Sequence, residues 1–299
     1  MSKVTKLSSF QEGNLVTFDI SPYSPNDKHA YMKMIHYKII ILLLLAWSPW
    51  DLVLPCPSIC TSGLQNDDFD ILMKKIRDGV AENPNIDKAL ELYDDVQGCF
   101  IDIDYARRDR TNWMPLIHVD RLYDFVFAYT HPKNSYYQNE DLYHKIVKGL
   151  EYWHHRNPHC NNWWYNQIGI PKTLGAAFIL LEEQLTDREH RAAVAVMENA
   201  KFGMTGQNKV WLAGNVLIRA LLQNDADLVK AARDAIASEI VLGRKEGIKD
   251  DWSFHQHGPQ QQFGNYGLSF VTGMSFFFQL FERYRFTSSP DSRGKYWFR

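Results

Sequence analysis

The amino-acid sequence predicts an all-α protein built from antiparallel helix hairpins. Apolar residues recur at three- and four-residue spacing through most of residues 66–284, which is the period of an amphipathic helix. Short loops rich in Pro, Asn and Gly separate these stretches, and no run of alternating apolar and polar residues predicts a strand. The 299 residues are 45% hydrophobic and 23% charged, which excludes a disordered tail, a collagen and a polytopic membrane protein.

The first two predicted helices lie on either side of Pro84. The triplet Asn66-Asp67-Asp68 predicts a helix cap, and the apolar face that follows it consists of Phe69, Leu72, Met73, Ile76 and Val80. A second helix is predicted to open at Asp87, with apolar positions at Leu90, Leu92, Tyr93 and Val96.

The rest of the domain is predicted as a series of further helices joined by short loops. Turn-forming residues mark loops at 131–134, at 157–158 and at 243–251. No sequence repeat is visible at a fixed period, so the hairpins are not expected to form a regular solenoid. The predicted helices cover residues 117–129, 139–155, 170–184, 186–201, 208–223, 225–242 and 265–284.

Residues 1–60 are predicted to be a leader that contains a signal segment at 32–54. The short basic stretch 32–38 leads into about nine apolar residues at 39–47, the pattern of a secretory signal. The apolar run is too short to cross a bilayer as a helix of the mature protein. We therefore expect a secreted or periplasmic location without stable membrane insertion after processing, and the alternative is a buried core segment.

The four cysteines are too few for a disulfide scaffold, and their spacing does not match a metal site. Cys56 and Cys60 could pair or be lost with the leader, whereas Cys99 and Cys160 are expected in the core or on the surface. The polar stretch 287–299 is predicted to be a tail outside the folded domain. The formal charge of −2 gives no indication of a nucleic-acid partner, and we expect a monomer.

The first segment that indicates chemistry is aromatic and rich in amides. Residues 161–171 contain Asn162, Trp163, Trp164 and Asn166 just before a predicted helix. A flat apolar ring beside amide groups suits a pyranose, which has CH faces and hydroxyl edges. The alternative is that both tryptophans belong to the core.

Two further segments stand out at the starts of later helices. In residues 205–211, Thr205 or Asn208 could cap the helix that follows. Residues 252–267 hold two His, four Gln and a Tyr in a glycine-punctuated loop. His255 and His257 could be read as a metal pair, but no neighbouring acidic or His cluster completes a site. We therefore predict no metal and no cofactor.

The three segments together resemble polysaccharide lyase family 8, which contains the chondroitin AC, hyaluronate and xanthan lyases. Residues 162–164 resemble its Asn-Trp-Trp patch, and Thr-Gly-Gln-Asn-Lys at 205–209 resembles its Thr-Gly-Ala-Asn-Arg motif. His257-Gly258-Pro259-Gln260, followed by Asn265-Tyr266-Gly267, resembles its His and Tyr loop with the same nine-residue interval. The order of the motifs also matches that of the family, and the sequence His-Gly-Pro-Gln is most similar to that of the chondroitin AC lyases.

The resemblance implies an incomplete α/α toroid over residues 61–286 and a lyase that cleaves uronic-acid polysaccharides by β-elimination. It implies that Asn208 offsets the charge of the substrate carboxylate and that His257 and Tyr266 are the acid–base pair. Which of the two takes the C5 proton stays open. Asn162, Trp163, Trp164 and Asn166 would hold the sugar chain. Chondroitin sulfate or hyaluronan is the implied partner, with Lys172, Lys209 and Arg219 either binding this polyanion or lying on solvated helix faces.

Two departures from the family pattern leave alternatives open. Family members continue with the rest of the toroid, with β-sandwich domains and with an active-site Arg, which residues 293–299 do not match. The resemblance therefore implies a truncated lyase, or a non-catalytic carbohydrate-binding remnant of one. A glycoside hydrolase would need two placed carboxylates, and Asp250 and Asp251 lie near the loop. The combination of amide, His and Tyr fits elimination better.

Overall fold

A computed structural model describes residues 66–79 and 84–281 of the chain. The predicted leader, its signal segment at 32–54, the tail at 287–299 and the cysteines at 56 and 60 lie outside these residues. Within the described ranges, no helix has the length and apolar character needed to span a membrane.

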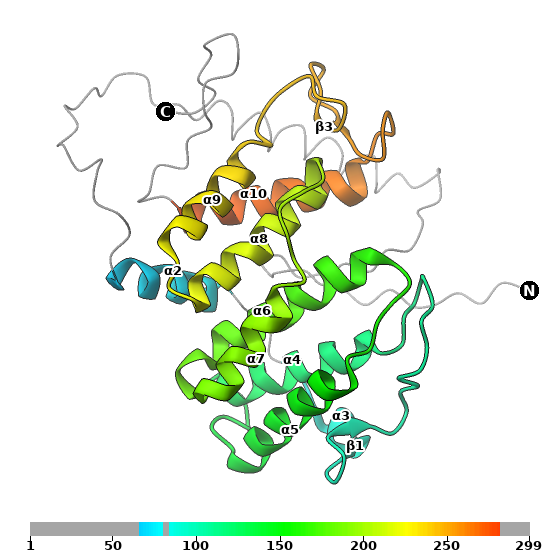
Figure 1. Ribbon diagram of the computed structural model, residues 1–299, viewed down its shortest axis with the longest axis vertical. Helices are drawn as coiled ribbons and strands as arrows, with labels where there is room; N and C mark the ends of the chain where they lie inside the picture. Colours follow the sequence, from blue (N-terminus) through cyan, green and yellow to red (C-terminus); the bar gives the residue numbers. More distant parts are fainter. Residues whose placement is uncertain (1–65, 80–83, 282–299) are drawn as a thin grey trace, which may run out of the picture.

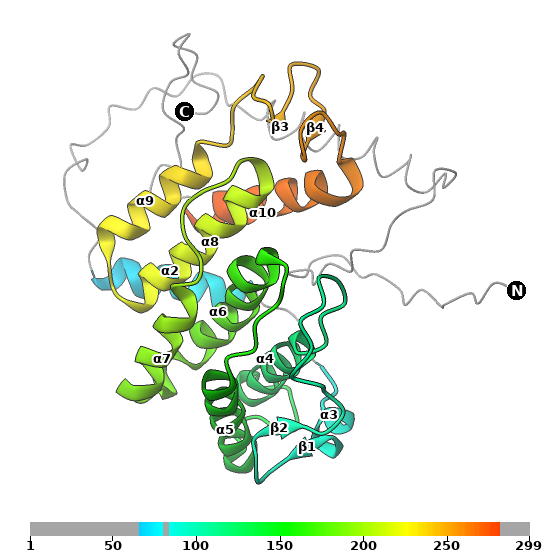
Figure 2. The same ribbon diagram turned by 45° about the vertical axis from the view of Figure 1, so that its right-hand side comes forward.

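Helices dominate the described chain and follow one another as antiparallel pairs (Figure 1). One row of helices consists of α4, α6, α8 and α10, in which α6 packs against α4 and α8, and α8 packs against α10. The alternate helices α5, α7 and α9 return the chain on one side of this row (Figure 2). Their bounds are α4 Leu116–Thr130, α5 Glu140–Arg156, α6 Ile170–Leu181, α7 Asp187–Met197, α8 Gly206–Leu222, α9 Ala226–Ala237 and α10 Leu268–Leu280.

The three returning helices each begin at a side chain that accepts a hydrogen bond from a first-turn amide. Asn139 caps α5 by accepting from Leu142 N, and Asp225 caps α9 by accepting from Leu228 N. Thr186 forms a capping box with Glu189 at the start of α7. Because these caps satisfy amides that have no partner inside the helix, the predicted starts near 139, 186 and 225 agree closely with the structure.

The predicted helix from Asp87 through Val96 is wrong over its second half. Helix α3 covers only Asp87–Glu91, and the chain then forms an antiparallel hairpin of β1 (Tyr93–Asp94) and β2 (Cys99–Phe100). The Asp94 carboxylate accepts from the amides of Val96 and Gln97, which closes a tight turn in place of a helix. Gly98 completes that turn at φ +77°, where a side chain would overlap the Lys148 carbonyl.

Two more boundaries differ from the sequence-based prediction. Helix α9 ends at Ala237 rather than 242, and the following loop contains a second short hairpin, β3 (Gly247–Ile248) with β4 (Phe254–His255). Helix α10 is preceded by a turn of π-helix, η3 (Phe263–Gly267), and a similar turn, η1 (Tyr165–Gly169), precedes α6. A short 3-10 turn, η2 (Glu182–Gln184), ends α6. The fold class is nevertheless all-α, because each strand has only two residues.

Helix α2 (Asn66–Asp78) lies across the C-terminal ends of α6 and α10. Lys75 Nζ donates to Gln279 O at 2.8 Å, and Arg77 Nε donates to Ile179 O at 2.9 Å. The last carbonyls of a helix have no partner within it and carry partial negative charge, so cationic donors stabilise them. The buried face of α2, Phe69 to Ile76, joins the core that α6, α8 and α10 share.

A second core lies between the β1–β2 hairpin, α4 and α5, and it contains a buried histidine. His118 has no exposed surface, and its ring bonds the Tyr105 hydroxyl at 2.8 Å and Gly149 O at 3.1 Å. Burial penalises the imidazolium form and lowers the pKa of His118 to about 4. Cys99 and Cys160 are also buried, and both are free thiols.

Arg77→Ala is expected to lower the free energy of unfolding by about 1–2 kcal/mol, because it removes a charged donor from the end of α6. The ion pairs of Arg77 with Glu182 and Glu183 add little, since they are partly exposed. Urea denaturation measures the change. Lys74→Ala is the control, because it removes only an exposed pair with Asp78 and should cost less than about 0.5 kcal/mol. Equal losses in both variants would contradict this role of α2.

His118→Gln is expected to flatten the acid side of the stability profile. The unfolded chain binds a proton at the ordinary His pKa and the folded chain only near pH 4, so wild-type stability falls as pH falls between these values, by up to about 3 kcal/mol. Burial and Asp124 raise the pKa of Asp120 to about 7, which gives the opposite slope and is present in both proteins. Unfolding curves at pH 6.5 and 4.5 measure the difference. The exposed His144→Gln is the control and should follow wild type.

Candidate active site

The three motif segments meet at one end of the helix row. Turn η1 leads into α6, Thr205 precedes α8, and turn η3 leads into α10, so each segment lies at a helix N-terminus. These starts lie at the end of the row opposite α2 (Figure 2). Helix N-termini carry partial positive charge, and they favour an anionic ligand. Turns of π-helix are also frequent at functional sites.

A row of aromatic rings connects the three segments. The ring centroids of Trp164 and Trp211 are 5.7 Å apart, and those of Trp211 and Tyr266 are 5.6 Å apart. The His257 ring contacts Tyr266 edge to face at 4.9 Å. Trp211, on the second turn of α8, is therefore the side chain that joins the aromatic segment to the His and Tyr loop. Lys172 Nζ lies 6.0 Å from the Trp211 centroid, and burial lowers the pKa of Lys172.

Some side chains of the aromatic segment are exposed to solvent, and others pack or form hydrogen bonds within the protein. Trp163 is 36% exposed, whereas Trp164 packs partly buried against Tyr165 and Trp211. The Asn162 amide donates to Arg110 O and accepts from Trp164 N, and the Asn166 amide exchanges two hydrogen bonds with the Cys160 backbone. Trp163 is thus the free ring of this segment, while the two amides hold the loop in shape.

Asn208 lies in the first turn of α8, one turn before Trp211 on the same face. It is only 6% exposed, and its Oδ1 accepts no hydrogen bond from any described residue. The neighbouring Gln207 Oε1 is likewise without a donor among the described residues. Buried polar atoms of this kind are rare, because leaving one unbonded is unfavourable. Asn208 Oδ1 can therefore accept a hydrogen bond from a ligand, and Nδ2, which also bonds no described residue, is the atom that can donate one.

Neither Thr205 nor Asn208 caps α8, in contrast to the simple capping interpretation of this segment. Thr205 occupies the position before the helix but its side chain bonds no first-turn amide; its hydroxyl donates to Glu246 instead. The first amides of α8, which have no acceptor within the helix, donate instead to side chains from later in the chain. Gly206 N donates to Glu239 Oε2 at 2.8 Å, and Gln207 N donates to Gln256 Oε1 at 2.9 Å.

The three cationic side chains suggested by the sequence have different surroundings. Lys209 bonds Ser238 and the buried Glu239, at 2.7 and 2.9 Å, so its charge is neutralised within the protein. Arg219 lies eleven residues beyond Asn208 on α8, about 16 Å along the helix. Lys172, beside Trp211, is therefore the one of the three that lies at the aromatic row.

His257 is exposed and Tyr266 is half-buried beside it. His257 has φ +56° and Gly258 has φ +81°, so the chain makes a left-handed turn at the motif. Burial, with the negative charge of Glu246, raises the pKa of the Tyr266 phenol. The site thus combines an uncommitted amide, a solvent-accessible imidazole and a protonated phenol, which can move a proton to and from a bound molecule.

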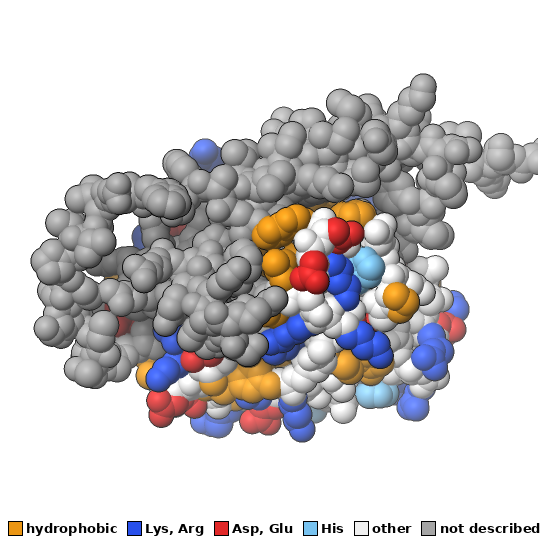
Figure 3. Space-filling view, turned by 90° about the horizontal axis from the view of Figure 1, so that it is seen from above, with side chains coloured by type: hydrophobic (Ala, Val, Ile, Leu, Met, Phe, Trp, Pro, Cys, Tyr) orange, Lys and Arg blue, Asp and Glu red, His pale blue; other side chains and the backbone are white. Residues whose placement is uncertain are grey.

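Two carboxylates near the loop, those of Asp251 and Glu246, are already engaged in hydrogen bonds. Asp251 accepts from both Ser253 N and Ser253 Oγ, and Glu246 accepts from the loop backbone and from two side chains. A hydrolase would need two carboxylates free to work on one glycosidic bond. Across the described ranges, no three His, Cys, Asp or Glu side chains are grouped as metal ligands. Figure 3 shows cationic, acidic and His side chains beside apolar ones on the described part of the upper face.

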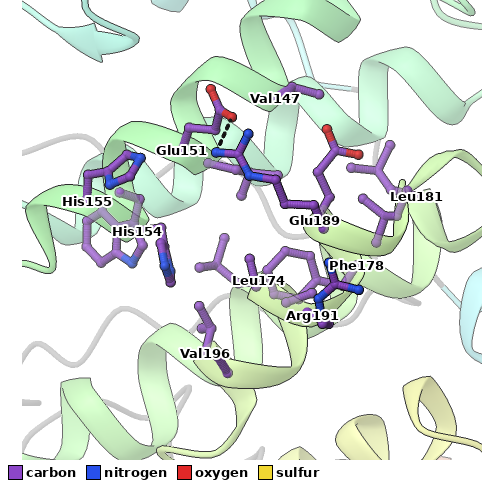
Figure 4. A pocket seen from close by; sticks show the side chains of 17 residues that line it. Val147, Glu151, His154, His155, Leu174, Phe178, Leu181, Glu189, Arg191 and Val196 are labelled. Atoms are coloured by element: carbon purple, nitrogen blue, oxygen red, sulfur yellow. Dashed lines mark ion pairs between the residues drawn. The ribbon is translucent and has the colours of Figure 1, made fainter.

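A cavity of about 410 Å³ lies away from this site, between α5, α6 and α7 (Figure 4). Its floor is apolar and includes Leu174 and Phe178 from α6. An ion pair of Arg188 with Glu151, at 3.1 Å, joins α7 to α5 beside it. None of the motif side chains lines this cavity, so it does not belong to the candidate active site.

Gly206→Ala is expected to disrupt the start of α8 and lower the free energy of unfolding by about 1–3 kcal/mol. Gly206 has φ +58°, and an added Cβ would overlap Gln256 Oε1. The control is Gly203→Ala, because a Cβ at Gly203 meets no atom within 4 Å. Thermal unfolding of the two variants measures the difference. Similar melting temperatures for both would contradict a fixed contact between α8 and Gln256.

Comparison with known proteins agrees with the geometry. The model of polysaccharide lyase family 8, N-terminal alpha-helical domain, matches residues 50–293. Chondroitinase-AC of Pedobacter heparinus is 32% identical over 59% of this chain and 26% of its own length. A hyaluronate lyase of Thermasporomyces composti is 29% identical over 58% of this chain and 23% of its own length. The chain thus spans about a quarter of the length of these relatives.

A solved structure gives the same result for the fold. A chondroitinase AC lyase studied as enzyme–oligosaccharide complexes superposes with a TM-score of 0.67 at 27% identity, covering 74% of this chain and 34% of that one. The predicted fold class, part of an α/α toroid of antiparallel hairpins, is confirmed. Since the family model matches most of its residues, the chain belongs to polysaccharide lyase family 8 and represents the N-terminal helical domain of that family.

Proposed function

We propose that this chain cleaves a uronic-acid glycosaminoglycan, chondroitin sulfate or hyaluronan, by β-elimination. The observation that carries the proposal is the uncommitted buried amide of Asn208 on the same helix face as Trp211, whose ring touches Tyr266 and, through it, His257. Family membership supports lyase chemistry, and relatives named chondroitinase and hyaluronate lyase support the substrate class.

The chemistry needs an amide beside an acid–base pair. Removal of the C5 proton places further negative charge next to the substrate carboxylate, which makes that proton weakly acidic. A donor held against the carboxylate in a dry site offsets this charge and is worth about 3–4 kcal/mol. The donor for this bond is Asn208 Nδ2, which makes no hydrogen bond to a described residue, so it can bind the carboxylate without first breaking one.

The acid–base pair then completes the elimination. The Tyr266 phenol, kept protonated by its raised pKa, donates a proton to the departing O4. In one route the exposed His257 imidazole takes the C5 proton. In the other, the Tyr266 phenol first gives its proton to His257 when substrate binds, and the resulting phenolate takes the C5 proton and then donates it to O4. In both routes the C5–H and C4–O bonds break, a C4–C5 double bond forms, and no water is added.

The exposed ring of Trp163 and the N-terminal helix ends bind the substrate. Trp163 offers an apolar face to a pyranose, and the N-terminal ends of the helical segments that contain α6 and α10 favour its carboxylate or sulfate groups. Lys172 adds a cation beside the row. Action on an extracellular polysaccharide also fits the predicted signal at 32–54, and we include export in the proposal.

A second candidate is a carbohydrate-binding protein without turnover. The observation that favours it is Trp163, whose exposed ring can bind the apolar face of a sugar whether or not elimination follows. In that case Trp163 and the helix ends still bind the polysaccharide while the unsaturated product does not form.

Tyr266→Phe and Asn208→Ala are expected to reduce β-elimination by about a hundredfold or more, because each removes a group that acts in the transition state. The measurement is ultraviolet absorbance of unsaturated uronate after incubation with chondroitin or with hyaluronan. Oligosaccharide binding should stay within a few-fold of wild type. Arg219→Ala is the control and should leave the rate unchanged. Undiminished turnover in either site variant would refute the assignment, and binding without product in wild type would favour the second candidate.

A further inference from the structure

The carboxylate of Glu246 connects two parts of the site. Glu246 lies partly buried in the loop between α9 and β3. Its Oε1 accepts from Gly258 N at 2.9 Å. Its Oε2 accepts from Gln256 Nε2 at 2.6 Å and from the Thr205 hydroxyl. One side chain thus contacts both the His257 loop and the residue that precedes α8.

The turn that carries His257 needs such a contact. A side chain in the left-handed region costs about 1–2 kcal/mol, and His257 at φ +56° lies in it. Gln256 N donates to Gln260 O at 3.0 Å across this turn. Within the turn, Gly258 N donates to the Glu246 carboxylate. Because Glu246 is ionised, its bond to Gly258 N is charge-assisted and stronger than a bond between neutral groups.

The second oxygen of the carboxylate extends the connection to Asn208. Gln256 is 1% exposed, and its Oε1 accepts from Gln207 N at 2.9 Å. Its Nε2 donates to Glu246 and, at 3.4 Å, to Thr205 O. Burial alone would raise the pKa of Glu246, but the bonds from Thr205 and Gly258 and the nearby His257 lower it overall. Glu246 therefore stays charged and keeps both sets of hydrogen bonds.

We propose that Glu246 is the positioning residue for His257: its carboxylate fixes the 257–258 turn against the start of α8, so that the imidazole and the Asn208 amide face one sugar. This inference rests on the proposed function and deepens it. Glu246 does not touch the reacting atoms, since its oxygens are directed to the protein. Its contribution is to fix geometry, on which the rate depends strongly.

The first test does not depend on turnover. Hydrogen exchange of the Gly258 amide is measured in the full chain for wild type, Glu246→Ala and Glu198→Ala. Removing the acceptor should accelerate Gly258 exchange by about tenfold or more. Glu198 is exposed at the end of α7, and it belongs to none of the three motif segments, so its variant should match wild type. Unchanged Gly258 exchange in Glu246→Ala, with the chain folded, would overturn the inference.

The second test separates positioning from stability. Glu246→Ala should lower kcat about tenfold or more while KM changes less than about twofold, because the oligosaccharide-holding groups stay in place. Glu246→Gln retains an oxygen acceptor and should recover part of kcat. It also removes a charge that raises the pKa of Tyr266, so the alkaline limb of its pH profile should move to lower pH.

The shift of the alkaline limb depends on the side chains that face Tyr266. They are the titratable His257, the charged Glu246 and the neutral Trp211 from α8. An unmoved alkaline limb together with unchanged kcat would overturn the inference. Faster Gly258 exchange in Glu246→Ala without any product from wild type would refute the proposed function, while the hold of Glu246 on the turn would stand. Product from wild type with unaffected Gly258 exchange would give the opposite result.

Discussion

The start of α8 is the point on which the rest of the site depends. A helix leaves its first amides without partners, and here those of Gly206 and Gln207 are bonded by the buried side chains of Glu239 and Gln256. Both acceptors come from the segment that follows α9, more than thirty residues later. Satisfying one helix end therefore fixes a long loop, and that loop carries His257 to the helix face where Asn208 and Trp211 lie. The positive φ of Gly206 lets the two backbones approach this closely.

The hairpin topology explains why the chemistry gathers at one end. Because alternate helices run in the same direction, α6, α8 and α10 all begin at the same end of the row, and the loops that precede them meet there. Their aligned N-termini favour an anion at that end. The opposite end carries partial negative charge, and α2 supplies Lys75 and Arg77 to it. One arrangement thus separates a cation-stabilised end, which serves stability, from an end suited to an acidic polysaccharide.

Local sequence signals predicted the helices but not the tertiary contacts that take the place of local helix caps. Apolar periodicity located α4 to α10, and side-chain caps fixed several of their starts. The error at 87–96 arose because Leu92 and Tyr93 also fit helical spacing, while the turn depends on Gly98 against Lys148 in α5. The motif residues were visible in sequence. The roles of Trp211, Gln256 and Glu246 were not, because each depends on contacts across about 40 to 55 residues of chain. The sequence left open whether Lys209 binds a polyanion or lies on a solvated helix face, and its ion pair with the buried Glu239 could not be predicted from local sequence.

The central claim is that the starts of α6, α8 and α10 form one surface that binds an acidic sugar chain. Tryptophan indole N–H signals, followed by NMR during titration with a chondroitin oligosaccharide, test it without requiring turnover. The account predicts that Trp163 and Trp211 shift together and saturate, while Trp153, which lines the cavity between α5, α6 and α7, stays in place. Shifts at Trp153 with none at Trp163 and Trp211, or no shift at any indole, would contradict it.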